Sequence, residues 1–124
     1  MVNILLMEKS THESLNYLKF LNLAQAIRKL PSYPEMDAVE ERLLNMLAVA
    51  WHVGKKITVL EAMAMLTDIS ATTAHRRLKT LRKKGMIALN ADEADNRIKY
   101  VTSTPTAMKY FAKLSECIDK AHSA

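Results

Sequence analysis

The residues best suited to chemistry lie between Ser70 and Gly85, a stretch with six Lys and Arg side chains and no Asp or Glu. Hydroxyl groups and an imidazole come before these cations, at Thr72, Thr73 and His75. Lys and Arg bind phosphate oxygens, and Arg is the best bidentate reader of guanine in the DNA major groove. Short hydroxyl side chains complete the set of groups that contact base edges. The stretch therefore predicts contact with double-stranded DNA.

A helix is predicted to position these groups. Ser70 is a favourable N-cap, and Gly85 suits the position after the helix because a left-handed conformation costs glycine little. The apolar side of this helix is predicted to be Ala74, Leu78 and Leu81. The opposite, basic side is predicted to be Thr72, Arg76, Lys79 and Lys83, with His75 and Thr80 at its flanks. A basic helical face is often only solvated surface, so the neighbouring elements decide between the two interpretations.

The residues on both sides of this helix predict a winged helix-turn-helix. Residues 58–66 favour a short helix, and residues 67–69 favour a tight turn. After Gly85 the periodicity changes to that of strands at 86–90 and 97–103, joined by a polar turn. A helix-turn-helix followed by a two-stranded ribbon is a winged helix. The expected fold class is mainly α with a small β-wing, with dimerisation helices at the N- and C-terminal ends.

Longer helices are predicted at both ends of the chain. Residues 13–30 spread apolar side chains over about half of the helical wheel, more than one neighbour covers, so a second subunit is expected against this helix. Residues 31–34 contain two prolines that end it. Thr104 and Pro105 are predicted to begin the last helix, as N-cap and first helical residue. Residues 1–7 fit either a short strand or a loose tail.

Another helix is predicted over residues 35–53, with Asp37 and Glu40 as a capping box at its start. Its inward stripe is predicted to be Val39, Leu43, Met46, Leu47 and Ala50. Trp51, near its end, is interpreted as a core residue. Thr58 is the predicted N-cap of the short helix that follows. The inward side of that short helix is predicted to be Leu60, Met63, Ala64 and Leu66.

The composition of the whole chain limits the remaining classes of protein. The 124 residues suffice for one domain with a core, and 49% apolar with 25% charged residues is typical of a globular protein. A net charge of +5 suits a polyanionic partner. No apolar run is long enough to span a membrane, and no signal peptide is recognisable, so we expect a cytoplasmic protein without a membrane partner.

Catalytic and metal chemistry have little support in the sequence. The four histidines lie far apart, without His-x-x-x-His or Cys-x-x-Cys spacing, at positions 12, 52, 75 and 122. Two glycines in all exclude a Gly-rich phosphate loop. We therefore predict no enzyme, no metal and no cofactor. Cys117, the only cysteine, is interpreted as a small apolar residue, with redox sensing as the alternative. Asp92, Glu93 and Asp95 are interpreted as a solvated turn rather than a cation site.

Residues 69–87 resemble the recognition helix of MarR-type regulators. In that family an opening Ser is followed by hydroxyl residues, an Arg and a closing Leu-x-x-x-Gly-apolar-apolar run. The predicted wing strengthens the resemblance, since Asp92 and the run Asp95-Asn96-Arg97 are similar to the family's Asp-rich wing tip with its Asp-x-Arg pattern. The following strand also runs into a Thr-capped helix. The resemblance covers about residues 57–107.

The resemblance implies a homodimeric transcriptional regulator, expected to be a repressor, that reads a palindromic operator. The 70–85 helix would enter the major groove and the 90–98 wing the minor groove, with Asp95 holding Arg97 in place. Together with the outward-facing cations, the residues expected at DNA are Ser70, Thr72, Thr73, His75, Arg76, Lys79, Lys83, Asn96 and Arg97. The residues expected in the dimer interface are Tyr17, Phe20, Leu21, Leu23, Ala24, Ile27, Phe111, Leu114 and Ile118.

The predicted organisation is one compact domain in three parts. Residues 1–35 form an N-terminal extension and dimerisation helix, 36–104 the winged helix-turn-helix that binds DNA, and 105–124 a C-terminal helix. The alternative function is a winged helix used for protein interaction, or as a replication or partition accessory of a plasmid or phage. A small-molecule effector stays open as a further partner, and the sequence identifies neither it nor the operator.

Overall fold

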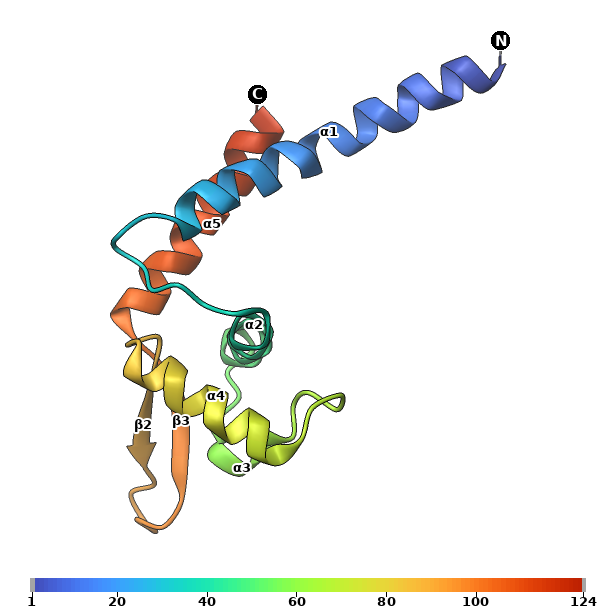
Figure 1. Ribbon diagram of the computed structural model, residues 1–124. Coiled ribbons are helices and arrows are strands. Elements are labelled where there is room, and N and C mark those ends of the chain that lie inside the picture. The colour runs from blue at the N-terminus through green and yellow to red at the C-terminus, as the bar shows by residue number, and fades with distance from the viewer. Residues whose placement is uncertain (1, 124) are drawn as a thin grey trace. The chain divides into compact units, whose positions relative to one another are not determined.

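A computed structural model describes the backbone of residues 2–123 and the side chains of residues 15–122 (Figure 1). The chain divides into two units. One is Met36–Met108, and the other combines Met1–Glu35 with Lys109–Ala124.

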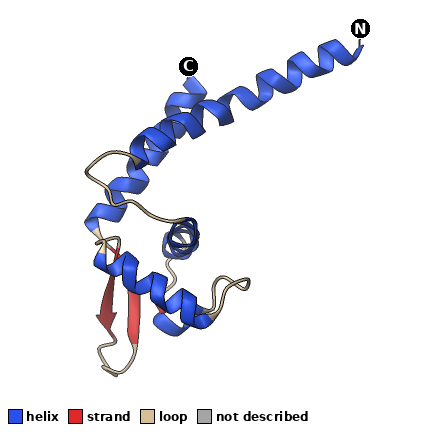
Figure 2. Ribbon diagram, viewed as in Figure 1, coloured by secondary structure: helices blue, strands red, loops and turns tan. Residues whose placement is uncertain are grey.

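The Met36–Met108 unit contains three helices and a small sheet (Figure 2). Its helices are α2 (Ala38–His52), α3 (Val59–Met63) and α4 (Ala71–Lys83). Its strands are β1 (Ile57–Thr58), β2 (Ile87–Ala91) and β3 (Lys99–Ser103), in the antiparallel order β1-β3-β2. The predicted mainly α fold with a β-wing is confirmed. A third strand joins the hairpin, because β1 pairs Ile57 with Val101 at its edge.

Apolar side chains from all three helices and the sheet form the core of this unit. Its buried members include Leu43, Leu44, Leu47, Ala62, Leu66, Ala74, Leu78, Leu81, Ile87 and Val101. Three predicted core residues are wrong, since Met46 is 43% exposed, Leu60 is 77% exposed and Ala64 is also exposed. Leu44 and Ala62 are buried instead. The apolar stripe of α2 is therefore shifted around the helix, and α3 is too short for a helical wheel to define its inward side.

The predicted caps of α2, α3 and α4 are confirmed. Asp37 and Glu40 form a capping box at α2, and Thr58 forms one with Glu61 at α3. The Ser70 hydroxyl accepts a 3.1 Å hydrogen bond from the backbone N–H of Thr73 at the start of α4. Gly85 follows α4 with φ of +78°, the left-handed conformation that favours glycine. Ser70 and Gly85 thus fix where α4 begins and ends, and so which of its side chains are available to a partner.

The wing is the β2–β3 hairpin, in which Ile87 pairs with Ser103 and Ala91 with Lys99. Trp51 supports it from the end of α2, because its indole Nε1–H donates a 3.0 Å hydrogen bond to the Val101 carbonyl oxygen. The Trp51 side chain is half-buried rather than enclosed in the core, so its interpretation as a core residue is incomplete. It binds the sheet through a polar group as well as packing against it.

The other unit contains α1 (Val2–Arg28) and most of α5 (Pro105–Ser123). Helix α1 begins well before the predicted start at Glu13, so the backbone of residues 2–7 is helical and neither strand nor tail. The Tyr110 hydroxyl accepts a 3.2 Å hydrogen bond from Arg28 Nε, and its ring meets that of Tyr33 edge-on at 5.3 Å between centroids. None of the helices that the structure describes is long and apolar enough to cross a membrane.

Candidate nucleic-acid interface

The outward face of α4 carries most of the residues predicted to contact DNA. Ser70, Thr72, Arg76, Lys79 and Lys83 are exposed, while Thr73 and His75 are half-buried at its edge. The Ser70 hydroxyl donates a 2.9 Å hydrogen bond to the Thr73 hydroxyl, so these two groups are held together at the start of the helix. Hydroxyls at the N-terminal end and cations further along are the arrangement that reads base edges and binds phosphates at the same time.

The six cations of residues 70–85 divide into two sets. Arg77 and Lys84 turn towards α2, where Arg77 Nη1 lies 3.0 Å from Asp37 Oδ2 and Lys84 Nζ 2.8 Å from Glu40 Oε1. The other four line one hollow of the surface with Thr80, and they are Arg76, Lys79, Arg82 and Lys83. Among the described residues these four have no acidic partner within ion-pair distance. Four cations, rather than six, are therefore available to a polyanion.

Arg97, at the wing, is held by a neighbouring carboxylate. Its Nε donates a 3.0 Å hydrogen bond to Asp95 Oδ1 and its Nη2 a 3.1 Å bond to Asp95 Oδ2, while its side chain stays 91% exposed. Asp95 Oδ1 also accepts the backbone N–H of Arg97 at 3.0 Å. The hydrogen bonds from the Arg97 side chain and backbone lower the pKa of Asp95, and the same side-chain pairing raises the pKa of Arg97. The wing thus presents a fixed guanidinium to the solvent, with exposed Asn96 beside it.

Asp92 organises the turn of the wing. Its Oδ1 accepts a 3.0 Å hydrogen bond from the Tyr100 hydroxyl, and its Oδ2 accepts the backbone N–H groups of Ala94 and Asp95, each at 3.0 Å. The Tyr100 bond is the main cause of the lowered pKa of Asp92, and it raises the pKa of Tyr100. Among the described side chains no three His, Cys, Asp or Glu residues are grouped to hold a metal ion. No pattern in the sequence indicated that Tyr100 would tie the two strands together through Asp92.

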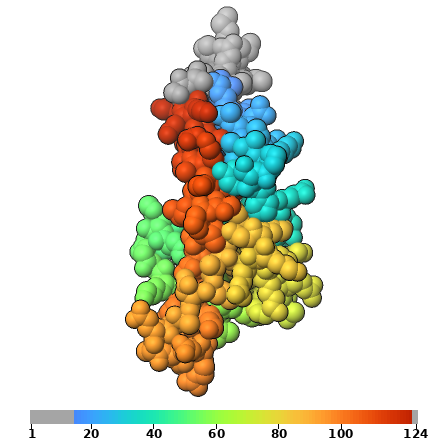
Figure 3. Space-filling model, turned by 90° about the vertical axis from the view of Figure 1, so that its left-hand side faces the viewer, coloured from blue at the N-terminus to red at the C-terminus, as the bar shows by residue number. Residues whose placement is uncertain are grey.

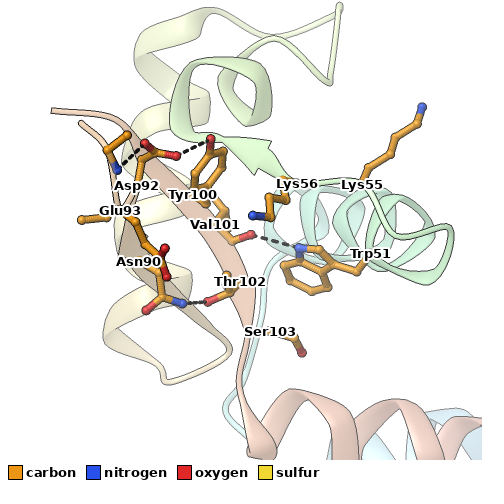
Figure 4. Close-up of a pocket in the computed structure, with 12 residues that line it drawn as sticks. Trp51, Lys55, Lys56, Asn90, Asp92, Glu93, Tyr100, Val101, Thr102 and Ser103 are labelled. Atoms are coloured by element: carbon orange, nitrogen blue, oxygen red, sulfur yellow. Dashed lines mark hydrogen bonds between the residues drawn. The ribbon is translucent and has the colours of Figure 1, made fainter. Parts of the chain in front are cut away.

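A hollow of about 460 Å³ lies beside the wing, bordered by Trp51, Lys56 and Tyr100 (Figure 4). Several of the residues that line this hollow contact one another. The Asn90 side-chain amide donates a 2.8 Å hydrogen bond to the Thr102 hydroxyl, and Lys56 Nζ lies 5.6 Å from the centre of the Tyr100 ring. The Asn90 bond links β2 to β3, Lys56 contacts the hairpin from the loop after α2, and the Trp51 bond joins the hairpin to α2 itself.

The carboxylates of the wing predict how it responds to acid. Asp92 and Asp95 have pKa values below the ordinary 3.8, so their contribution to folding is present above that pH and is lost as the pH falls through the lowered pKa values. In an NMR titration, the side-chain carboxyl signals of both residues should therefore move below pH 3.8. Tyr100→Phe should raise the pKa of Asp92 and leave that of Asp95 unchanged. Ordinary pKa values for both carboxyls in the wild type would contradict this prediction.

Helix α4 and the wing are adjacent parts of one surface. Strand β2 follows α4 directly through Gly85, and in the space-filling view α4 and the hairpin form neighbouring parts of the same face (Figure 3). Helix α5 starts beside this junction, because the Thr104 hydroxyl donates a 2.6 Å hydrogen bond to the Gly85 carbonyl and accepts the backbone N–H of Ala107 at 3.1 Å. A helix with four free cations thus stands next to a hairpin with a fixed arginine.

Similarity to solved structures identifies the class of fold. No protein-family model matches the sequence, and no curated protein matches it significantly. A mutant of S. aureus MepR bound to an oligodeoxyribonucleotide is similar with a TM-score of 0.65 and 17% identity, over 98% of this chain and 79% of that one. The heme sensor PefR from Streptococcus agalactiae, in complex with heme, is similar with a TM-score of 0.55 and 20% identity, over 98% and 74%.

A third similar structure is the transcriptional regulator Tm0710 from Thermotoga maritima, with a TM-score of 0.60 and 12% identity, over 99% of this chain and 78% of that one. All three are MarR-family regulators. The fold of this chain is accordingly a winged helix-turn-helix, similar to that of these three structures, and the fold that the resemblance implied is confirmed.

Proposed function

We propose that this protein is a sequence-specific, double-stranded DNA-binding transcriptional regulator, acting as a repressor. Helix α4 enters the major groove and the wing enters the minor groove. One observation carries the proposal. Four cations of α4 lie on the same surface as Arg97 of the adjoining hairpin, which Asp95 holds in place. The proposed contacts are Ser70, Thr72, Thr73, His75, Arg76, Lys79, Lys83, Asn96 and Arg97. One of the similar structures, MepR, is bound to an oligodeoxyribonucleotide, which supports the same use of this fold.

The proposed assembly is a homodimer formed through α1 and α5. Several apolar side chains of these helices are exposed in the single chain, and they include Leu15, Tyr17, Leu18 and Ile118. A second subunit would cover them. Two winged helices related by a two-fold axis would read both halves of a palindrome about one helical turn apart. In this arrangement residues 1–35 and 105–124 serve dimerisation and residues 36–104 bind DNA.

A second candidate function is a winged helix that binds another protein. It is favoured by exposed apolar side chains outside the proposed dimer helices, at Val49, Val53 and Leu60. Selection of bound sequences from random duplex DNA separates the two candidates. A regulator should enrich a palindromic site and bind it with a strong salt dependence, because cations release the counterions condensed on DNA. No enrichment, with no salt-dependent binding of any duplex, would favour the protein-binding module.

Replacing Arg97 by alanine should lower affinity for many DNA sequences, and most at sites with A·T-rich flanks. A narrow minor groove concentrates negative potential and attracts an inserted arginine. Titrations of duplexes with A·T-rich and G·C-rich flanks would measure the effect. Lys99→Ala is the matched control, because it removes one other exposed cation from the same hairpin, at the turn end of β3. Equal affinities and salt slopes for Arg97→Ala and the wild type would exclude the wing from the mechanism.

A further inference from the structure

Three half-buried polar side chains of α4 and its C-cap contact the start of α2. Arg77, Thr80 and Lys84 recur every three or four residues, so they share one side of the helix. All three contact Asp37 or Glu40, the two residues of the α2 capping box. We propose that this capping box is a clamp that sets the orientation of the recognition helix, and that Glu40 is a positioning residue for DNA recognition. The proposal rests on the proposed DNA-binding function.

Glu40 is the centre of the clamp. The residue is almost fully buried, at 2% exposure, and it is the one buried charged residue among the described side chains. Oε1 accepts the backbone N–H of Asp37 at 3.0 Å and Lys84 Nζ at 2.8 Å. Oε2 accepts the Thr80 hydroxyl at 3.0 Å. A buried carboxylate is tolerated when such donors satisfy it, and here one donor comes from the start of α2 itself and two come from α4 and its C-cap.

Asp37 extends the clamp to a second cation. Its Oδ1 accepts the backbone N–H of Glu40 at 2.8 Å, which completes the capping box, and its Oδ2 lies 3.0 Å from Arg77 Nη1. The Arg77 Nε is buried and has no hydrogen-bond partner among the described residues, so the ion pair with Asp37 is what fixes the guanidinium. The two carboxylates thus hold α4 at two successive turns.

The clamp fixes the orientation of α4 on α2, which the apolar contact between the two helices does not. Leucine side chains of α2 and α4 are buried where the two helices pack, and apolar packing tolerates small shifts and rotations. A buried carboxylate with several donors is satisfied in one arrangement only, since any displacement leaves a charge or a hydroxyl without its partner. Major-groove recognition depends on the angle of the helix, because bidentate hydrogen bonds to bases have a fixed geometry. Glu40 therefore influences which sequence is read without touching DNA.

The clamp also predicts that alanine substitutions of the neighbouring residues Lys83 and Lys84 change DNA binding in different ways. Lys83 is exposed in the cationic hollow of α4, whereas Lys84 is bonded to Glu40. Lys83→Ala should remove a phosphate contact, which lowers affinity for all duplexes alike and reduces the salt slope by about 0.9. Lys84→Ala should leave the salt slope unchanged and lower the ratio of specific to non-specific affinity by roughly tenfold, the loss typical of one weakened base contact. The same substitution at adjacent positions is thus a matched pair.

The experiment uses the full-length chain with Lys83→Ala, Lys84→Ala, Lys84→Arg, Glu40→Gln and Thr80→Val. Affinities for the selected site and for an unrelated duplex are measured across a range of salt concentrations. Glu40→Gln and Thr80→Val, which change the shape of the side chain least, should lower the ratio of specific to non-specific affinity without changing the salt slope. Lys84→Arg should keep the ratio of the wild type. A fall in salt slope for Lys84→Ala equal to that for Lys83→Ala would overturn the proposal, and so would an unchanged affinity ratio in Lys84→Ala and Thr80→Val.

A second measurement is independent of DNA. Amide hydrogen exchange of α4 should become faster in Thr80→Val and Lys84→Ala than in the wild type or Lys83→Ala, because the helix is less firmly held. Equal exchange in all four proteins would overturn the clamp. A wild type that prefers no DNA sequence would instead overturn the proposed function, and the exchange data would still decide whether the clamp exists. If Glu40→Gln does not fold, the Thr80 and Lys84 variants decide the question.

Discussion

A chain with both Tyr17→Asp and Ile118→Asp is expected to sediment as a monomer at concentrations where the wild type is a dimer. Tyr17 on α1 is 61% exposed and Ile118 on α5 is 56% exposed in the single chain, so neither substitution removes much packing within the protomer. At the proposed interface each aspartate would become a buried charge without a partner, which typically costs about 3–5 kcal/mol. A single such cost raises the dissociation constant about a hundred- to a thousand-fold or more.

Asn22→Asp is the matched control for this prediction. Asn22 is an exposed polar residue of α1, so the control adds one of the two negative charges, the one on α1, without replacing an apolar side chain. Analytical ultracentrifugation of the three proteins should give a dimer for the wild type and the control and a monomer for the double variant. A wild type that is monomeric at micromolar concentration is inconsistent with the proposed assembly, as is a folded double variant that remains dimeric.

Arg76→Ala is expected to weaken binding to the selected DNA site by about 1–3 kcal/mol, or roughly five- to a hundred-and-fifty-fold. Arg76 is exposed on the outward face of α4, and no described acidic side chain pairs with it. A guanidinium in this position can donate two hydrogen bonds to the O6 and N7 atoms of one guanine. The loss should therefore be greatest for the selected site and smaller for unrelated duplexes.

Arg76→Lys separates the charge from the geometry. Lysine keeps the positive charge but lacks the planar pair of donors, so its variant should keep the salt slope of the wild type and lose most of the preference for the selected site. Titrations of the selected duplex and of a variant with the guanine replaced would measure both effects. If Arg76→Ala binds the selected site as tightly as the wild type, the groove-facing side of α4 has been assigned incorrectly.

The parts of the fold that local chemistry determines were predictable from the sequence. The ends of α4 follow from two residues. The Ser70 hydroxyl caps the first turn, and Gly85 adopts the positive φ that follows the last one. The two capping boxes are pairs three residues apart, and the hairpin follows from a change of periodicity. The wing pairing of Asp95 with Arg97 was also implied, because the two residues are close in sequence and the family resemblance includes that pattern.

The features that the sequence did not reveal depend on contacts between distant residues. Glu40 meets Thr80 and Lys84, which are 40 and 44 positions away, so only its capping role was visible in the sequence. The helical periodicity places Arg76, Lys79 and Lys83 on the outward side of α4, but it gives no partner for Arg77 or Lys84, which pair with Asp37 and Glu40. The exposure of Leu60 shows the same limit, because a five-residue helix has no defined apolar stripe until its neighbours are known.

The charge of the wing bears on the order of events in the proposed binding to DNA. Between Asp92 and Lys99 the hairpin carries three carboxylates against two cations, so from a distance the wing does not attract a polyanion. Helix α4 does, through its four free cations, and should therefore govern the association rate and its dependence on ionic strength. Arg97 would engage only at short range, once its fixed guanidinium reaches the minor groove. Its contribution should then appear in the residence time of the complex.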